Sequence, residues 1–449
     1  MIIILQYLIS IFTGYKILNT NGWQRLAWYF SSITLVSTAF NFYSGIAFTK
    51  SHLFFVSLFI VSIIKEGKFK RRYLIGNPLS SSLLFLFISY ILIGIFDERL
   101  GIFLGVYRGI LNYATHFGAF FIGWISTYEK INYKKLIRFI CTLSLIFTIY
   151  GIYTFVTKSN PVIDALGFEN RFNFERANAS FREFLVSGFL MESGVYGLSC
   201  FIFLIFLWAI KGKHNYIQNF TFVLLFINIF LTGTRSIMIP SILGIIVFIT
   251  VNYNIKKKVK YLLTGIFASL IVLVIFPDTV GRYCGEIITS IIDVISPEGS
   301  GGADLGGSSI EARDMQITAA FMKYLPEKPL FGHGFNYFAE VILMKNQGVN
   351  DSELLGMESY LCFLGVEYGL VNIIAVVTFF TSLIVYTIKN KHVNKTLYSM
   401  LLSITITYIV YLITAYMGNS WLYAMPAIGF LVGNIEQLKR KQAQSRINL

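Results

Sequence analysis

Residues 276–369 contain Gly299-Ser-Gly-Gly-Ala-Asp-Leu-Gly-Gly-Ser-Ser309, Glu311-Ala-Arg-Asp314, Pro329-Leu-Phe-Gly-His-Gly-Phe335 and Glu358-Ser-Tyr360. Together these motifs form the one long polar interruption in a chain that otherwise consists of apolar runs. A polar stretch of this length between apolar runs predicts a large loop outside a membrane. We expect an active site, if there is one, within this stretch or facing it.

The composition excludes a soluble fold. Of the 449 residues 55% are hydrophobic and 13% are charged, and the mean hydropathy is +0.65. These values predict an all-α polytopic membrane protein, with residues 1–449 as a single integral membrane domain. The chain has 37 Lys and Arg against 23 Asp and Glu, but the basic residues cluster in short turns between apolar runs. This pattern follows the positive-inside rule, so nucleic acid is not an expected partner.

Neither a metal nor a cofactor is expected. Four scattered cysteines lack the paired spacing of a zinc site or a redox motif, and they indicate no disulfide framework. They are Cys141, Cys200, Cys284 and Cys362. The N-terminal Met1–Leu5 lacks the basic segment and the cleavage site of a signal peptide, so the first helix is expected to remain in the protein.

Apolar runs long enough to cross a membrane recur along the chain. A hydrocarbon core about 30 Å thick requires roughly 20 apolar residues in a helix. The predicted spans are 2–18, 25–45, 52–65, 80–97, 108–127, 137–156, 187–210, 216–233, 236–253, 260–277, 358–388, 397–416 and 420–435. We therefore expect about 12 to 13 transmembrane helices.

The basic turns orient these spans. They lie at 65–72, 130–138, 211–213, 256–260, 389–395 and 439–441. All of them fall on one side when the spans alternate, and that side is predicted to be cytoplasmic. The opposite side, predicted to be periplasmic, receives a smaller loop at 157–187 and a large loop at 277–356.

The large loop is expected to contain short helices. Gly299–Ser309 reads as a flexible connector, whereas residues 310–325 carry apolar side chains at helical spacing. This spacing predicts an amphipathic helix on the membrane surface that Pro326 and Pro329 end. Gly332 and Gly334 predict a turn. No inverted repeat of the kind found in many transporters is evident, which favours chemistry at the outer face over transport.

Arginines recur on the predicted external side. Guanidinium is the natural partner of phosphate, because its planar fork offers parallel donors to two oxygens and keeps its charge. The external arginines are Arg171, Arg176, Arg182, Arg235, Arg282 and Arg313. Arg235 is the most specific candidate because it stands in Leu231-Thr-Gly-Thr-Arg-Ser236, a turn between two apolar spans. Its alternative role is an interfacial anchor that extends to lipid headgroups.

Two more arginines are candidates for phosphate binding, and each also has a simpler explanation. Arg313 lies on the predicted surface helix between two acids, with which it would form local ion pairs on a solvated face. Arg176 opens Arg176-Ala-Asn-Ala-Ser-Phe181, where a simple loop charge is the alternative.

The external acids and bases include candidates for proton transfer. They are His333, Glu358, Glu367, Glu192, Asp351 and Glu353. A carboxylate beside lipid has a raised pKa and accepts a hydroxyl proton. Glu358 begins an apolar span, where it could equally be an acid stabilised by the helix dipole. His333, between two glycines, would bond the backbone or a sugar. Glu192 and Glu367 stand within apolar spans, where acids are functional by default but also pair with arginines.

These residues resemble the O-antigen polymerase and ligase superfamily of bacterial envelope glycosyltransferases. Four segments carry the resemblance in the family's order, over residues 176–370. They are Arg176-Ala-Asn-Ala-Ser-Phe, Leu231-Thr-Gly-Thr-Arg-Ser, Arg313 followed by Pro329-Leu-Phe-Gly-His-Gly-Phe, and Glu358-Ser-Tyr-Leu-Cys-Phe-Leu-Gly-Val-Glu-Tyr-Gly-Leu370. Each segment alone is weakly specific, but the ordered set on one membrane face is more so.

The resemblance implies a metal-independent transfer of glycan from undecaprenyl diphosphate at the periplasmic face of the bacterial inner membrane. Arg235 and Arg313 would bind the donor's diphosphate, and Arg176 would assist. Ligases of this family usually carry a His-Asn pair where this chain has Glu358-Ser359, which argues for polymerisation over ligation to lipid A-core. The general base would then be Glu358, with His333 as the second candidate.

The sequence thus predicts a polymerase of O-antigen or capsular repeat units. Its expected partners are an undecaprenyl-diphosphate-linked oligosaccharide and membrane lipid, with a chain-length regulator as a further candidate. The alternatives are a ligase that transfers glycan to lipid A-core or protein, and a flippase for lipid-linked oligosaccharide that performs no chemistry.

Overall fold

The computed structural model describes residues 1–37, 51–65, 76–129, 131–167, 185–209, 216–260, 263, 308–343, 354, 359–415 and 418–447. Within these residues the regular elements are helices and there is no strand. The protein is therefore an all-α, polytopic membrane protein, as the composition predicts. Helices long and apolar enough to cross a membrane are Ile2–Asn19, Tyr133–Thr157, Tyr360–Lys389 and Lys395–Thr414, and further apolar helices in the described ranges have 10–17 residues.

The N-terminal part contributes α1 (Ile2–Asn19), α2 (Gly22–Leu35), α4 (Ser51–Lys65), α6 (Ser80–Ile95), α7 (Ile102–Thr115), a short 3-10 turn η1 (Phe117–Ala119), α8 (Phe120–Ser126) and α9 (Tyr133–Thr157). The helices lie close to the predicted spans, with two differences. The helix in the predicted span 25–45, α2, ends at Leu35, where Val36 takes an extended conformation. The expected single span at 108–127 is divided into α7 and α8, because the backbone of His116 turns away from helical geometry at ψ −94°.

The middle of the chain adds α10 (Pro161–Ala165), α12 (Ser193–Ala209), α13 (Tyr216–Leu231), α14 (Arg235–Asn252) and α17 (Ser308–Ala319), followed by the wide turn η2 (Ala320–Tyr324) and α18 (Leu325–Glu327). Residues 310–325 are thus helical, whereas their place on a membrane surface stays a prediction. The sequence predicts that Pro326 ends this helix, and that prediction is wrong. The helix continues through the π-helical turn η2 into α18, which has Pro326 in its first turn. The predicted span at 260–277 and the connector Gly299–Ser309 lie largely or wholly outside the described residues.

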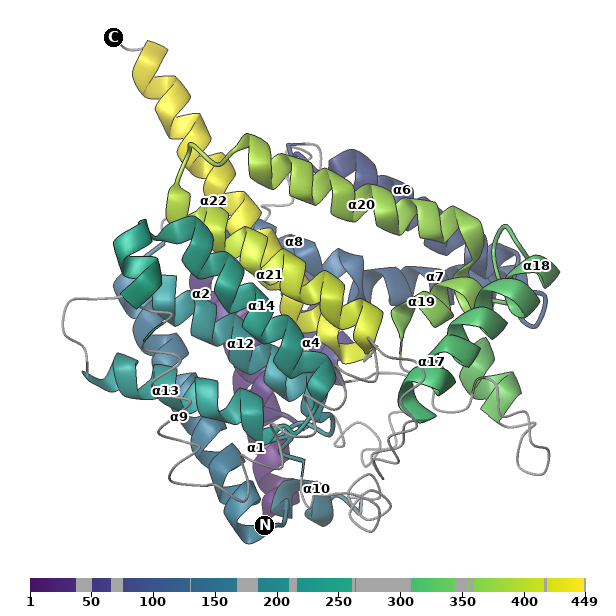
Figure 1. Ribbon diagram of the computed structural model, residues 1–449, viewed down its shortest axis with the longest axis horizontal. Coiled ribbons are helices and arrows are strands. Elements are labelled where there is room, and N and C mark those ends of the chain that lie inside the picture. Colours follow the sequence, from purple (N-terminus) through teal and green to yellow (C-terminus); the bar gives the residue numbers. More distant parts are fainter. Residues whose placement is uncertain are drawn as a thin grey trace.

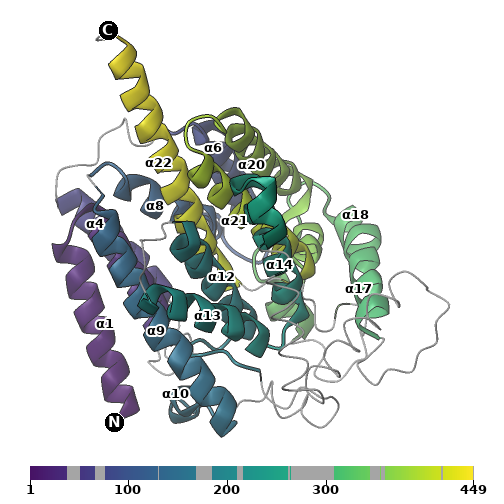
Figure 2. The ribbon, with the colours of Figure 1, turned by 60° about the vertical axis from the view of Figure 1, so that its left-hand side comes forward.

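The C-terminal part consists of η3 (Phe338–Leu343), α19 (Tyr360–Phe363), η5 (Leu364–Tyr368), α20 (Gly369–Lys389), α21 (Lys395–Thr414), η6 (Gly418–Ser420) and α22 (Trp421–Ile447). Figure 1 shows the two termini at opposite ends of the bundle, with the C-terminal half of α22 extending beyond it. Figure 2 shows α1 and α4 on one flank, and α17 and α18 on the opposite flank.

The core is built around α12 and the first half of α22. Every residue of α12 from Gly194 to Leu207 is buried, and so is nearly every residue of α22 from Trp421 to Ile435. A helix that is apolar on all sides and buried on all sides belongs to the interior of a bundle. The neighbours of α12 are α9, α13, α14, α21 and α22.

A series of hydroxyl groups joins α14 to α21. Pro240 has no amide hydrogen, so it leaves the carbonyl of Ser236 without its helical donor. The Thr414 hydroxyl donates to that carbonyl at 3.2 Å. Further along the pair, the Thr407 hydroxyl donates to Pro240 O at 3.0 Å and the Ser403 hydroxyl donates to Gly244 O at 2.7 Å. Side-chain hydrogen bonds of this kind hold membrane helices together where lipid offers no partner.

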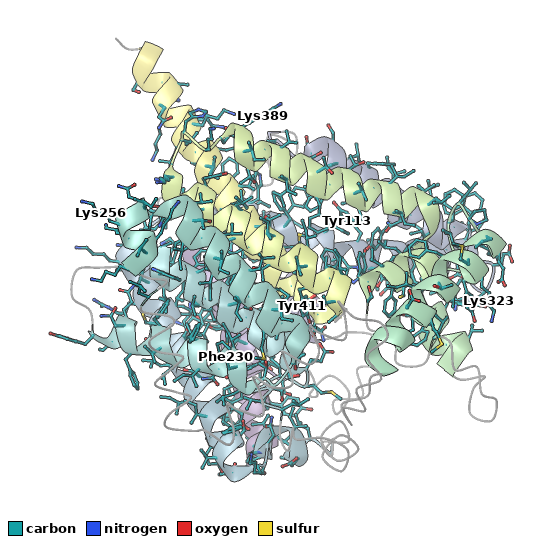
Figure 3. All side chains as sticks on the ribbon, viewed as in Figure 1. Tyr113, Phe230, Lys256, Lys323, Lys389 and Tyr411 are labelled. Carbon is teal, nitrogen blue, oxygen red and sulfur yellow. The ribbon has the colours of Figure 1, made fainter. Side chains whose placement is uncertain are left out.

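The two ends of the bundle are named here by the residues that mark them. Lys256 and Lys389 lie towards one end, which we call the basic end, whereas Phe230 and Tyr411 lie further towards the other (Figure 3). Contacts of α22 also lie at the basic end. At the basic end Arg440 donates to Gly76 O at 3.3 Å, and Tyr133 donates to Asn434 Oδ1 at 3.0 Å.

We call the opposite end the site end. The loops that meet here are predicted to lie on the same side of the membrane, because the predicted spans alternate in direction. Here Val186 N donates to Leu231 O at 3.2 Å. The hydroxyls of Ser193 and Thr234 lie 2.8 Å apart. The arrangement agrees with the predicted alternation of spans.

We predict that the basic end and the site end lie on opposite sides of the membrane. In a background without cysteine, E98C at the site end should react with a membrane-impermeant maleimide in intact cells. K256C and K389C should react only after the membrane is opened. All three native side chains are exposed. Labelling of K389C together with E98C in intact cells would contradict this topology.

Candidate functional site

The long helix that starts at Tyr360 is broken nine residues after its start. Its pieces are α19, the π-helical turn η5 and α20, and the break lies at Gly369, which has φ +70°. Only glycine adopts such a conformation without strain. At the break several backbone amides and carbonyls lack the hydrogen bonds that a continuous helix would give them. Inside a membrane protein such groups need partners from the protein itself.

The segment Pro329–Phe335 provides those partners. The amides of His333 and Gly334 donate to the carbonyls of Val366 and Glu367, each at 3.0 Å. In the other direction, the amides of Leu370 and Val371 donate to the carbonyls of Pro329 and Leu330 at 2.8 and 3.1 Å. The predicted turn at Gly332 and Gly334 is therefore the part of the large loop that fills the break, and we call Pro329–Phe338 the filling segment.

Close approach explains the glycines of this segment. Gly332 has φ +65°, and a Cβ atom there would lie 2.4 Å from the backbone of Glu367. Gly334 has φ +94°, and a Cβ atom there would lie 2.1 Å from the carboxylate of Asp97. Side chains at either position would push the filling segment out of the break.

Glu367 fastens the end of the filling segment. Its buried carboxylate accepts the amide of Phe338 at 3.0 Å and the amide of Asn336 at 3.2 Å. The sequence left open whether this acid is catalytic or pairs with an arginine. In the described part of the chain its hydrogen bonds go to backbone amides instead, and this use of a buried carboxylate satisfies two donors at once.

A charged cluster holds the same segment from the α6–α7 corner. Asp97, whose side chain is fully buried, accepts two hydrogen bonds from Arg99 at 2.9 and 2.8 Å. Arg99 also donates to Phe335 O at 2.8 Å and lies 3.3 Å from Glu340. Arg108 reaches the other carboxylate oxygen of Glu340 at 2.9 Å. The two pairs with Glu340 join residues more than 230 positions apart in sequence, so sequence patterns gave no signal for them.

His333 is enclosed by this arrangement. It is only 7% exposed, it stacks on Tyr337 with ring centres 4.5 Å apart, and Tyr324 meets its edge at 5.9 Å. Its Nε2 atom lies 3.3 Å from the carboxylate of Glu327, but the two make no hydrogen bond. Burial, together with Lys328 and Arg99 nearby, lowers the pKa of His333 to about 4, against the opposing effect of Asp97 and Glu98. The imidazole is therefore neutral at pH 7.

The residues that follow Arg235 and Glu358 in the chain, Ser236 and Ser359, both contact the C-terminal end of α21. Arg235 is the first residue of α14, and the carbonyl of the next residue, Ser236, receives the Thr414 hydroxyl. Ser359, which follows Glu358, caps α19 by accepting the amide of Leu361 at 3.2 Å. The same hydroxyl donates to Ile413 O at 2.7 Å. The beginnings of α14 and α19 are thus attached to consecutive residues of α21.

The two groups are separated along the broken helix. His333 is bonded to Val366, seven residues after Ser359, which corresponds to about 10 Å at the helical rise of 1.5 Å per residue. The structure therefore brings together Ser236 and Ser359, the residues that follow Arg235 and Glu358. The backbone of His333 is bonded to η5 instead. The helix that carries Arg313, α17, leads into η2, and η2 packs on η5, with Ala320 O close to Gly365.

Several predicted residues lie outside the described part of the chain. These are Arg176 and Glu358, together with the side chains of Arg235 and Arg313. Their roles remain predictions. Among the residues that the structure does describe, no group of three or more His, Cys, Asp or Glu is placed to hold a metal ion.

Part of the chain matches a known protein family. Residues 220–377 match a family model described as O-antigen ligase. This range begins in α13 and ends in α20, so it includes the Arg235 turn, the filling segment and the broken helix. No curated protein matches the chain.

We predict that Glu367→Leu destabilises the protein and that Glu367→Gln does so less. Leucine leaves the amides of Asn336 and Phe338 without an acceptor, at about 1–3 kcal/mol for each buried amide, whereas the single glutamine oxygen still accepts one of the two. Thermal unfolding of the purified protein measures the difference. Glu98→Leu, at an exposed ion pair, is the matched control and should change little. Equal stability of the two Glu367 variants would contradict this role.

We also predict that stability falls as the pH decreases from about 6.5 to about 4, in part because of His333. In this range the unfolded chain binds a proton on His333 and the folded protein does not, so acid favours unfolding. The unfolding temperature of His333→Phe should therefore depend less on pH than that of the wild type. His392→Phe, at an exposed histidine of the basic end, should keep the wild-type slope. Identical slopes for all three proteins would contradict a neutral, buried His333.

Proposed function

We propose, on the premise that the chain belongs to the O-antigen polymerase and ligase superfamily, that it polymerises O-antigen or capsular repeat units. The family indicates a glycosyltransferase-like enzyme of O-antigen biosynthesis in a membrane. Our more specific proposal is that glycan is transferred from undecaprenyl diphosphate onto a lipid-linked repeat unit. The reaction takes place at the site end, which we assign to the periplasmic side of the inner membrane.

One observation carries this proposal. The start of α14 at Arg235 and the start of α19 after Glu358 are attached to neighbouring residues at the end of α21. These are the two positions at which the sequence predicts a diphosphate ligand and a general base. A transfer reaction requires the leaving group and the base at one place, and the described backbone supports such a meeting.

Helix ends add a reason for an anion at this place. The N-terminal ends of α12 and α14 adjoin, because the hydroxyls of Ser193 and Thr234 lie 2.8 Å apart. The first amides of a helix carry a partial positive charge that favours phosphate groups. The guanidinium of Arg235 would add a full charge that pH does not remove. Arg313 on α17 and Arg176 are proposed to complete the diphosphate site.

The proposed step balances without a metal or a cofactor. An acceptor sugar hydroxyl attacks the anomeric carbon of the donor, and a glycosidic bond forms as the bond from that carbon to the phosphate oxygen breaks. The base accepts the hydroxyl proton, and the lipid diphosphate departs with its electron pair. Arginines stabilise the charge that develops on the diphosphate, and this electrostatic contribution supplies most of the rate enhancement.

Glu358 is the first candidate for the base. A base is most effective when its pKa lies near the working pH, and the pKa of His333 is lowered to about 4. The imidazole is therefore a weak proton acceptor at neutral pH, and its backbone lies about two helical turns from Ser359. These facts support Glu358 over His333 for this role.

Polymerisation is preferred to ligation because of the residues that open α19. This chain has Glu358-Ser359 where ligases of the family usually have His-Asn, and Ser359 is used as a helix cap and as a donor to Ile413. The alternatives remain a ligase that transfers glycan to lipid A-core or protein, and a flippase without chemistry. We propose membrane lipid and a chain-length regulator as further partners.

Deletion of the gene, followed by gel analysis of surface glycan, tests the function. Loss of a polymerase leaves core with a single repeat unit, whereas loss of a ligase or a flippase leaves core with none. We predict the single-unit pattern. An unchanged ladder would refute all three functions.

Complementation of the deletion strain tests the site. Arg235→Ala and Arg313→Ala should fail to restore long glycan, because the diphosphate loses a charged partner, while both variants are still present in the membrane. Arg138→Ala, at an exposed arginine of the basic end, is the control and should restore the ladder. Near-normal polymer from both site variants would overturn the diphosphate assignment.

A further inference from the structure

We propose that His333 and Glu327 form a binding subsite for a neutral, hydroxyl-bearing sugar of the glycan. The subsite lies away from the reacting groups at Arg235 and Glu358. This inference rests on the proposed function, because it names a part of the substrate that the same loop contacts.

The first support is an unsatisfied polar atom. The Nε2 atom of His333 is buried and makes no hydrogen bond, although Glu327 is 3.3 Å away. A buried polar atom without a partner is costly, and such atoms in folded proteins ask for an explanation. A hydroxyl group supplies such a partner, because its oxygen can accept from Nε2–H of His333 while its hydrogen is donated to the Glu327 carboxylate.

The second support is access from outside. The side chain of Glu327 is 55% exposed, whereas that of His333 is 5% exposed. A ligand can therefore reach the pair from the side of Glu327. Glu327 belongs to α18 and His333 to the filling segment, so two separate elements form the subsite. The imidazole cannot swing out to find water, because it stacks on Tyr337 and its amide is bonded to Val366.

The charges around the pair select a neutral ligand. The carboxylates of Glu327 and Glu98 disfavour a phosphate, and Glu98 is itself paired with Lys328 at 2.7 Å. Lys328 and Arg99 disfavour a second cation, and both act on His333. The imidazole is uncharged at pH 7. A sugar hydroxyl meets these conditions, since it offers a donor and an acceptor without a net charge.

The position of the subsite indicates which sugar it would bind. His333 lies about 10 Å along the broken helix from the residues proposed to react. A sugar bound here would belong to the chain beyond the reacting residue. The subsite would therefore strengthen binding of the glycan and have little effect on the chemical step.

Calorimetric titration tests the proposal directly. The full-length protein in nanodiscs is titrated with the repeat-unit oligosaccharide, freed of its lipid and phosphate. We expect His333→Phe, which keeps an aromatic ring against Tyr337, to weaken binding about tenfold, as loss of a buried hydrogen bond does. Glu327→Gln should weaken it several-fold. His392→Phe, the same substitution at the basic end, should bind like the wild type.

Two results would overturn the subsite. One is wild-type affinity in both His333→Phe and Glu327→Gln, and the other is no binding of the oligosaccharide by the wild type. If His333→Phe fails to fold, the half-exposed Glu327→Gln decides the question. Addition of inorganic diphosphate should leave sugar binding unchanged, because the arginine site is separate. Failure of the proposed function would look different, since Arg235→Ala would then restore the ladder whatever the sugar affinity.

Discussion

The break at Gly369 imposes the constraint on which the site end depends. A broken helix in a membrane protein leaves backbone groups that lipid cannot satisfy. Here the filling segment supplies four backbone hydrogen bonds, and the Glu367 carboxylate accepts two more amides from that segment. The break and the loop therefore form one hydrogen-bonded unit. A helix without a break would need no filling segment and would leave His333 without a fixed position.

Other parts of the site end connect to this unit. Arg99 is held by the buried Asp97 and donates to Phe335 O, so the α6–α7 corner is tied to the filling segment. Tyr90 of α6 stacks on Phe335 at 5.6 Å and contacts His116 Nδ1 through its hydroxyl at 2.9 Å. His116 marks the interruption between α7 and η1. Tyr90 and Phe335 therefore link the break at His116 to the break at Gly369. Displacement of one broken helix would displace the other.

Hydropathy predicted the helices well, because apolar length is the signal that a membrane requires. It did not predict the breaks at His116 and Gly369, since the apolar runs continue through both. The charged cluster was also missed, because Arg99 and Arg108 find Glu340 only in three dimensions. In the candidate site, Arg235 and Glu358 were predicted from motifs, and the backbones beside them do meet at α21. The same motifs suggested His333 as a second base, but its burial among aromatic rings is a property of the fold.

The pairing of α14 with α21 has a consequence for how the protein is made. The Ser236 carbonyl, freed by Pro240, is satisfied by Thr414, which is synthesised about 180 residues later. Until α21 has entered the membrane, the start of α14 retains a polar group that lipid cannot satisfy. The turn that carries Arg235 would thus reach its final form late in biogenesis, after α21 has been synthesised. A nascent chain would be assembled as a set of inserted helices first and acquire a competent site only when its last helices arrive.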